Sequence, residues 1–100
     1  MSIAQTILDQ LGGTTKLKVM TGAHSFVAGE RDVTFQFGRK SPKNQIKYVK
    51  IILTPDDLYT VKFYQYKKFQ AIEILEIAGL YADMLKPTIE NETGLFLSLF

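Results

Sequence analysis

The clearest alternation of hydrophobic and polar residues runs from residue 32 to residue 37. Val33, Phe35 and Phe37 are apolar, and the residues before and between them are polar. Side chains of a strand point alternately to its two faces, so this pattern predicts a strand with one buried face.

The chain before this strand predicts a helix, a second strand and a connection. Apolar residues at helical spacing favour a helix at Ile3–Leu11, with Ser2 as its N-cap and Gly12-Gly13 as its end. Alternation predicts a strand at roughly Thr15–Met20, and residues 23–28, which lie between two glycines, are expected to form a connection.

A β-hairpin is predicted by the two β-rich runs Gln45–Leu53 and Leu58–Tyr66. They are separated by Thr54-Pro55-Asp56-Asp57, in which the proline suits position i+1 of a type I turn. We expect the apolar positions of both runs to point inward: Val49, Ile51 and Leu53 in the first, and Tyr59, Val61 and Phe63 in the second.

The C-terminal third is less regular. Phe69–Ala78 fits helix and strand equally well. A helix is then predicted by the helical spacing of Leu80, Tyr81, Met84, Leu85, Thr88 and Ile89. Pro87 predicts a kink or a fresh start, and Gly94 predicts the helix end. The apolar tail Leu95–Phe100 is expected to pack as a final strand or against a partner.

These elements predict a single α+β domain over residues 1–100. It has an antiparallel sheet of four or five strands, a short N-terminal helix, and a C-terminal helix of about three turns packed on one face. The sheet contributes Val33, Phe35, Phe37, Tyr59, Val61 and Phe63 to the core, and the helix contributes Leu80, Met84, Leu85 and Ile89.

Charge is unevenly distributed along the chain. Residues 39–68 carry eight basic and two acidic side chains, whereas residues 69–100 carry one basic and five acidic side chains. Such a division indicates either a surface that binds a partner or two charged regions that attract one another within the fold.

No catalytic, cofactor or metal motif stands out. The chain has no cysteine, and its one histidine, His24, is expected in a loop beside Ser25. Asp56-Asp57 is expected to cap the turn, and Gly12-Gly13-Thr14-Thr15 lacks the ending of a phosphate-binding loop and is expected to lie between a helix and a strand. We therefore expect no enzyme activity, cofactor or bound metal.

The N-terminal segment, residues 1–11, has no basic start, and polar residues interrupt its apolar positions. No apolar run approaches the ~20 residues of a membrane helix. The sequence therefore predicts a cytoplasmic protein without a membrane partner.

The basic hairpin offers the best candidate binding surface. Its candidate residues are Arg39, Lys40, Lys43, Tyr48, Lys50, Lys62 and Tyr64, with Tyr66 adjoining them. Aromatic rings that stack on bases, together with cations that contact phosphates, are typical of a surface that binds single-stranded nucleic acid. Ordinary packing or protein contact is the competing interpretation, and the acidic C-terminal helix could cover this face.

Three stretches carry a resemblance to a known group. They are Met20-Thr21-Gly22-Ala23 with Phe26; Tyr48-Val49-Lys50-Ile51 through Leu53-Thr54-Pro55-Asp56-Asp57 to Tyr59-Thr60-Val61; and Tyr81-Ala82-Asp83-Met84-Leu85 followed by Thr93-Gly94-Leu95 and Ser98-Leu99. This pattern resembles a family of small proteins of phages, prophages and mobile elements whose function is unknown. The resemblance implies a phage-type accessory protein inside a bacterial cell, and it brings no activity and no functional residues.

We therefore expect a non-enzymatic accessory protein that binds a host or phage macromolecule. A protein partner or a homodimer is the first interpretation. Single-stranded nucleic acid, bound at the basic hairpin, is the alternative.

Overall fold

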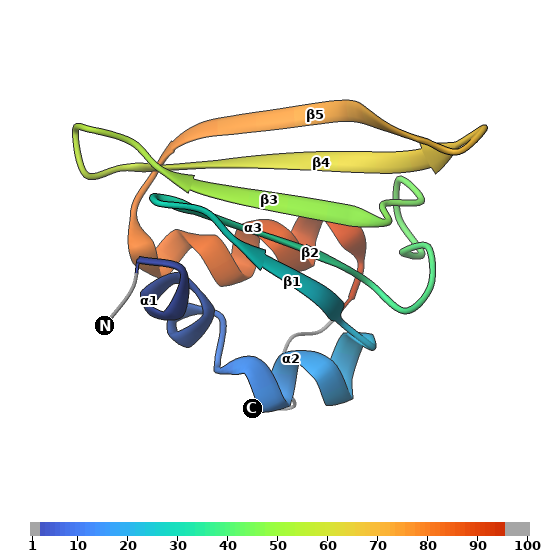
Figure 1. The fold of residues 1–100 in the computed structure, drawn as a ribbon, viewed down its shortest axis with the longest axis horizontal. Coiled ribbons are helices and arrows are strands. Elements are labelled where there is room, and N and C mark those ends of the chain that lie inside the picture. The colour runs from blue at the N-terminus through green and yellow to red at the C-terminus, as the bar shows by residue number, and fades with distance from the viewer. Residues whose placement is uncertain (1–2, 96–100) are drawn as a thin grey trace.

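Five antiparallel strands follow one another across a single sheet in chain order, so each is joined to the next by a simple connection (Figure 1). This is a computed structural model, which describes residues 3–95. The strands are β1 His24–Ala28, β2 Asp32–Gln36, β3 Tyr48–Leu53, β4 Tyr59–Lys67 and β5 Gln70–Leu80. The helices are α1 Ile3–Gln10, α2 Thr14–Thr21, the 3-10 turn η1 Ala82–Met84 and α3 Leu85–Thr93.

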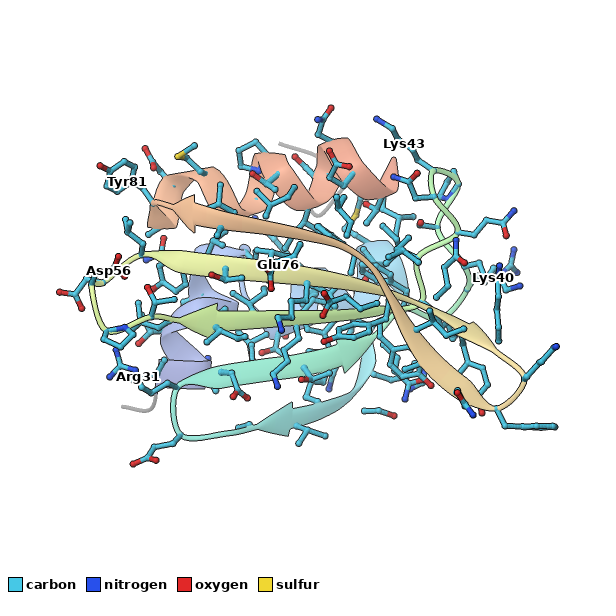
Figure 2. All side chains as sticks on the ribbon, turned by 90° about the horizontal axis from the view of Figure 1, so that it is seen from above. Arg31, Lys40, Lys43, Asp56, Glu76 and Tyr81 are labelled. Atoms are coloured by element: carbon cyan, nitrogen blue, oxygen red, sulfur yellow. The ribbon has the colours of Figure 1, made fainter. Side chains whose placement is uncertain are left out.

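The helices lie on one side of the sheet and leave its other face without a helical cover (Figures 1 and 2). The predicted α+β class and the antiparallel sheet with an N-terminal and a C-terminal helix are therefore confirmed. The core lies between the two layers and includes Ile7, Leu11, Leu17, Phe35, Phe63, Leu85 and Ile89, all without exposed surface.

The central strands follow the predicted alternation. Val33, Phe35 and Phe37 are buried on the helix side, and so are Val49 and Ile51 of β3. In β4, Tyr59, Val61 and Phe63 are buried, while Leu53 of β3 is partly buried against the core. Alternation identified this face correctly because each of these strands has one neighbouring strand on either side and only one covered face.

The turn between β3 and β4 has the predicted geometry. The amide of Asp57 donates to the carbonyl of Thr54 over 3.0 Å, which places Pro55 at position i+1. Asp57 then adopts a left-handed conformation with φ 63°, and the amide of Thr54 donates to the carbonyl of Leu58 over 2.8 Å. A type I turn followed by a left-handed residue is a common hairpin connection.

The predicted strand at Thr15–Met20 is wrong, because these residues belong to helix α2. Leu17 and Thr21, four residues apart, are the buried pair, and Val19 is 77% exposed. The side-chain hydroxyl of Thr21 donates to the carbonyl of Leu17 over 2.7 Å. Gly22 ends the helix in a left-handed conformation with φ 70°. The alternation of two β-branched or apolar residues was too short to exclude helical spacing.

The expected connection at residues 23–28 is also wrong, since His24–Ala28 form strand β1. This edge strand buries little surface, and its pairing with β2 contains a register shift between His24 and Val27. Its main inward residue is Phe26, whose ring centroid lies 5.6 Å from that of Phe35. A bulged, exposed edge strand gives little hydrophobic periodicity, which is why the sequence did not indicate it.

The undecided segment Phe69–Ala78 lies almost entirely in strand β5. A register shift between Phe63 and Tyr64 interrupts its pairing with β4. The shift places Glu73 and Glu76, which are three residues apart, on the same face. Neither period fitted the sequence because the bulge breaks the alternation of the strand.

The C-terminal helix starts later than predicted. Leu80 ends β5, and α3 begins at Leu85 after the short turn η1. Pro87 therefore lies in the first turn of α3, where a backbone amide has no carbonyl of its own helix to donate to. The proline thus marks a fresh start of the helix and does not kink it. Met84 is 40% exposed and does not belong to the predicted core, whereas Leu80, Leu85 and Ile89 do.

Gly94 ends α3 as predicted, with φ 73° and an amide that donates to the carbonyl of Glu90 over 2.9 Å. The proposed N-cap Ser2 and the tail beyond Leu95 lie outside the described residues. No helix within residues 3–95 is long and apolar enough to span a bilayer.

Candidate functional site

The predicted tyrosines and lysines of the hairpin share the open face of the sheet. The register of β3 and β4 sets Tyr48 opposite Tyr64 and Lys50 opposite Lys62, and all four side chains are partly exposed. The acidic helix α3 lies on the other side of the sheet, so it does not cover them (Figure 2). The structure thus brings together four of the seven predicted site residues.

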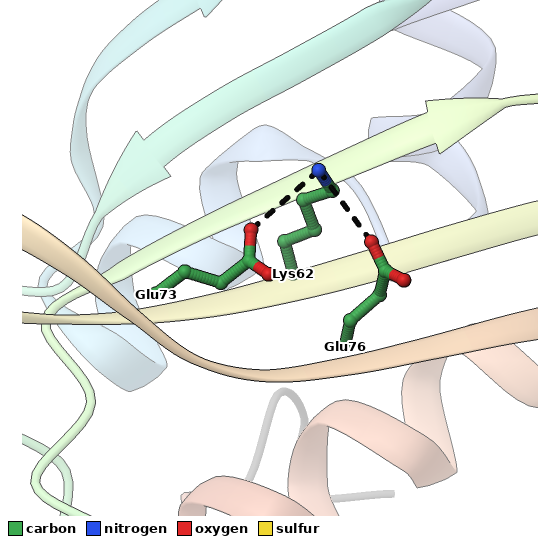
Figure 3. Close-up of polar contacts among 3 residues, drawn as sticks. All are labelled: Lys62, Glu73 and Glu76. Atoms are coloured by element: carbon green, nitrogen blue, oxygen red, sulfur yellow. Dashed lines mark ion pairs between the residues drawn. The ribbon is translucent and has the colours of Figure 1, made fainter.

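The positive charge at the centre of this face is balanced by strand β5. Nζ of Lys62 lies 3.5 Å from a carboxylate oxygen of Glu73 and 3.5 Å from one of Glu76 (Figure 3). The charge of Glu73 and a hydrogen bond with Glu76 raise the pKa of Lys62. Two carboxylates therefore pair with Lys62, which lies opposite Lys50, and their charge offsets the repulsion between the two lysines.

Tyr64 is linked to the same acidic pair. Its burial raises the pKa of its hydroxyl, and the nearby charge of Glu73 raises it further. Tyr64 is thus held neutral among charged neighbours. At the centre of the face Lys62 is thus paired, and the two carboxylates balance the charges of Lys62 and Lys50.

The loop between β2 and β3 carries the other three predicted residues, Arg39, Lys40 and Lys43. Nζ of Lys43 donates to the carbonyl of Asn91 over 2.9 Å, and Nδ2 of Asn44 donates to the carbonyl of Glu92 over 2.9 Å. Both acceptors belong to the last turn of α3, where carbonyl groups lack helical partners and attract cations. Lys43 therefore fastens the loop to the helix.

Lys40, in the same loop, lies beside a pair of stacked tyrosines. The rings of Tyr48 and Tyr66 have centroids 5.7 Å apart and planes inclined by 22°. With Gln36, Lys40 and Lys47 they line a hollow of about 320 Å³, in which none of the lining residues is acidic. Burial raises the pKa of the Tyr48 hydroxyl, and Tyr66 raises it further, so Tyr48 stays neutral.

The hairpin between β4 and β5 continues from this hollow. Lys67 pairs with Gln70, and Lys68 and Phe69 form the turn between them. Loop and hairpin lie at the same end of the molecule, and Figure 2 shows Lys40 at that end. We call this region the basic aromatic end and define it by Arg39, Lys40, Lys47, Tyr48, Tyr66, Lys67, Lys68 and Phe69.

Five of these eight residues are not among the site residues that the sequence predicts: Lys47, Tyr66, Lys67, Lys68 and Phe69. Lys47, Lys67 and Lys68 enter that prediction only through the count of basic residues, and Tyr66 only as an adjoining residue. A two-residue turn made of Lys-Phe carries none of the asparagine or glycine signals of such hairpins. The uninterrupted run Tyr66-Lys67-Lys68-Phe69 is the one available signal.

The other residues that the sequence singled out, His24, Asp56 and Gly12-Gly13, have contacts or positions that belong to the fold. Nδ1 of His24 lies 2.8 Å from Oγ of Ser25, and both side chains are exposed on the edge strand β1. The Thr54 hydroxyl donates to the carboxylate of Asp56, which lowers the pKa of Asp56 and holds the turn. Gly12-Gly13 joins two helices, so the expected order of helix, glycines and strand is wrong.

Within residues 3–95 no three histidine or acidic side chains are grouped as metal ligands. Comparisons with protein-family models, with curated protein sequences and with solved structures give no match.

Proposed function

We propose that this protein is a non-enzymatic binding protein whose basic aromatic end binds single-stranded nucleic acid. The observation that carries the proposal is the hollow beside the stacked rings of Tyr48 and Tyr66, which Lys40 and Lys47 line without an acidic neighbour among the lining residues. Nζ of Lys47 donates to the carbonyl of Phe37 over 2.5 Å, so Lys40 is the lysine of this hollow that we expect to contact a phosphate. Flat rings and ammonium groups are the two chemistries that unpaired bases and their phosphates require.

This proposal reverses the order of partners that the sequence favoured. The sequence placed the binding surface along the whole basic hairpin, where Glu73 and Glu76 occupy Lys62. Lys40 and Lys47, which have no acidic residue beside them in the hollow, lie at the end of the sheet next to the aromatic rings. A polyanion with exposed bases fits this arrangement better than an ordinary protein surface does.

The sequence resemblance to small phage and mobile-element proteins supports a setting for this activity. In that setting the protein is an accessory factor in the cytoplasm of a bacterial host. Strands of unpaired nucleic acid are abundant there during replication and transcription of a mobile element.

Fluorescence anisotropy of a labelled oligothymidylate of about 12 nucleotides tests the proposal. We expect binding at low salt, weakening as salt rises with a slope of about −0.7 per phosphate contacted. Tyr66→Ala is expected to weaken binding about 5- to 100-fold, which corresponds to the loss of one stacked base. Lys40→Glu is expected to weaken binding and to flatten the salt dependence.

Matched controls come from residues outside the set that defines the basic aromatic end. Lys16→Glu makes the same charge change on α2, and Tyr81→Ala removes an exposed tyrosine where β5 leads into η1, at the other end of the molecule (Figure 2). Both are expected to bind as the wild type does. The proposal fails if the wild type does not bind at low salt, or if Lys16→Glu weakens binding as much as Lys40→Glu.

A protein partner or a second copy is the other candidate, and the edge strand β5 favours it. Among the described strands β5 pairs only with β4, and Ile72 and Ile74 are 43% and 38% exposed. An open edge can accept a further strand. Sedimentation velocity tests this candidate: a dimer that Ile74→Lys dissociates supports it, and a monomer at all concentrations excludes self-pairing.

A further inference from the structure

The turn at the tip of the β4–β5 hairpin has an unfavourable backbone. Lys68 and Phe69 both have positive φ, 50° and 64°, as both central residues of a type I′ turn do. Such turns are usually made by asparagine, aspartate or glycine, because a β-carbon crowds the backbone in the left-handed region. A phenylalanine in this conformation is uncommon.

The side chain of Phe69 is also unfavourably placed for folding. It is 92% exposed, more than any other large hydrophobic side chain of the described residues. An apolar ring in water contributes nothing to the core. Neither the backbone conformation nor the side chain of Phe69 therefore stabilises the folded protein.

The hairpin carries this ring away from the sheet. The last paired residues of β3 and β4 are Tyr48 and Tyr64, and the pairing of β4 with β5 continues through Tyr66 and Ala71 to Lys67 and Gln70. The end of the hairpin is thus a two-stranded ribbon that projects past β3 (Figure 1). Phe69 is presented at its end.

The surroundings of the ring specify its partner. Lys67 and Lys68 precede it, and the stacked rings of Tyr48 and Tyr66 lie at the base of the ribbon with Lys40 and Lys47. A flat apolar group framed by ammonium groups complements a flat base attached to a phosphate backbone.

We infer that Phe69 is a wedge that stacks against or between unpaired bases, while Lys67 and Lys68 contact the phosphates on either side. This inference rests on the proposed function and adds to it the group that engages the base. It also specifies the substrate as an unpaired strand, because a base in a duplex is already stacked on both faces.

The absence of tryptophan from the chain provides a direct test. Phe69→Trp introduces one tryptophan at the tip, and Tyr81→Trp introduces one at an exposed position at the other end of the molecule. Titration with oligothymidylate is expected to quench the fluorescence of Phe69→Trp saturably, at the affinity that anisotropy gives. The fluorescence of Tyr81→Trp is expected to show no saturable change.

Phe69→Ala complements this readout. The ring lies outside the core, so this variant is expected to fold normally. It is expected to bind oligothymidylate about 5- to 100-fold more weakly than the wild type, with the salt dependence unchanged because no cation is lost. A duplex of mixed sequence is expected to quench Phe69→Trp far less than the single strand does.

The outcomes separate this inference from the proposed function. If anisotropy shows binding but Phe69→Trp is not quenched and Phe69→Ala binds like the wild type, the wedge is wrong and the binding function remains. Equal quenching by the duplex overturns the assignment to unpaired bases. If oligonucleotides do not bind but vesicles of anionic phospholipid shift the fluorescence of Phe69→Trp, the tip is a membrane contact and both proposals fail.

Discussion

At the scale of single residues, the two phenylalanines Phe35 and Phe69 represent opposite uses of the same side chain. Phe35 has no exposed surface and contacts the rings of Phe26 and Phe37 with centroids 5.6 and 5.8 Å away. Phe69 stands in water at the end of a hairpin. The first stabilises the fold through burial, and the second is available to a partner.

Alanine at these two positions is expected to have very different effects on stability. Phe35→Ala removes buried surface and leaves a cavity, so the free energy of unfolding is expected to fall by about 3–5 kcal/mol. Phe69→Ala is expected to change it by less than about 0.5 kcal/mol, as surface substitutions usually do. Urea denaturation followed by circular dichroism measures both, and a large loss in Phe69→Ala would mean that the tip packs onto the core.

The pKa of Tyr64 is expected to depend on Glu73. Because the folded protein raises this pKa, the neutral tyrosine contributes stability that is present below its ordinary value and is lost as the pH rises through the folded value. Glu73→Gln removes the nearby charge and is expected to lower the pKa of Tyr64, so ionisation begins at a lower pH. NMR titration of ¹³C-labelled tyrosine rings measures this, and an unchanged pKa would mean that Glu73 does not contribute to the shift.

At the scale of elements, the regular strands could be predicted from the sequence and the bulged ones could not. Alternation located β2, β3 and β4 because their two faces meet different environments. It failed for β1 and β5, where register shifts at His24–Val27 and Phe63–Tyr64 disturb the period of two. It also failed for α2, an eight-residue helix with only Leu17 and Thr21 buried, which is too little to impose a helical pattern.

The β4–β5 turn is expected to be one place where stability has been lost. Replacing its two residues with the favoured pair, Lys68→Asn with Phe69→Gly, relieves a conformation that costs an L-residue roughly 1–2 kcal/mol. We expect the free energy of unfolding of this double variant to be about 1–2 kcal/mol higher than that of the wild type, and its binding to oligothymidylate to be weaker. Lys68→Ala keeps both β-carbons and serves as the control. A double variant that is less stable would contradict the strain at this turn.

At the scale of the whole molecule, the basic region of the sequence is tied to the C-terminal third by two sets of contacts. Part of the acidic region meets the basic region within the fold, where Glu73 and Glu76 flank Lys62. The loop is fastened through Lys43 and Asn44 to carbonyl groups at the end of α3. What the sequence could not show was which lysines these contacts would use, since that depends on the bulge in β5 and on the side of the sheet that α3 covers.

The basic aromatic end therefore contains only part of the basic region that the sequence shows. Of the predicted residues, Lys50, Lys62 and Tyr64 belong to the neutralised centre of the sheet, and Lys43 is a structural contact of the loop. Arg39, Lys40 and Tyr48 remain with the residues of the tip. The site that chemistry favours is smaller than the basic hairpin, and it lies at one end of it.

Binding at the basic aromatic end is tested most directly by a ¹⁵N NMR titration of the protein with oligothymidylate. We predict that amide shifts concentrate in two segments, residues 36–48 and residues 65–72, which approach each other at the basic aromatic end. The amides of α1 and of the turn at residues 54–57 are predicted to stay in place. A spectrum that does not change, or one whose shifts lie on α1 or at that turn, would contradict binding at the basic aromatic end.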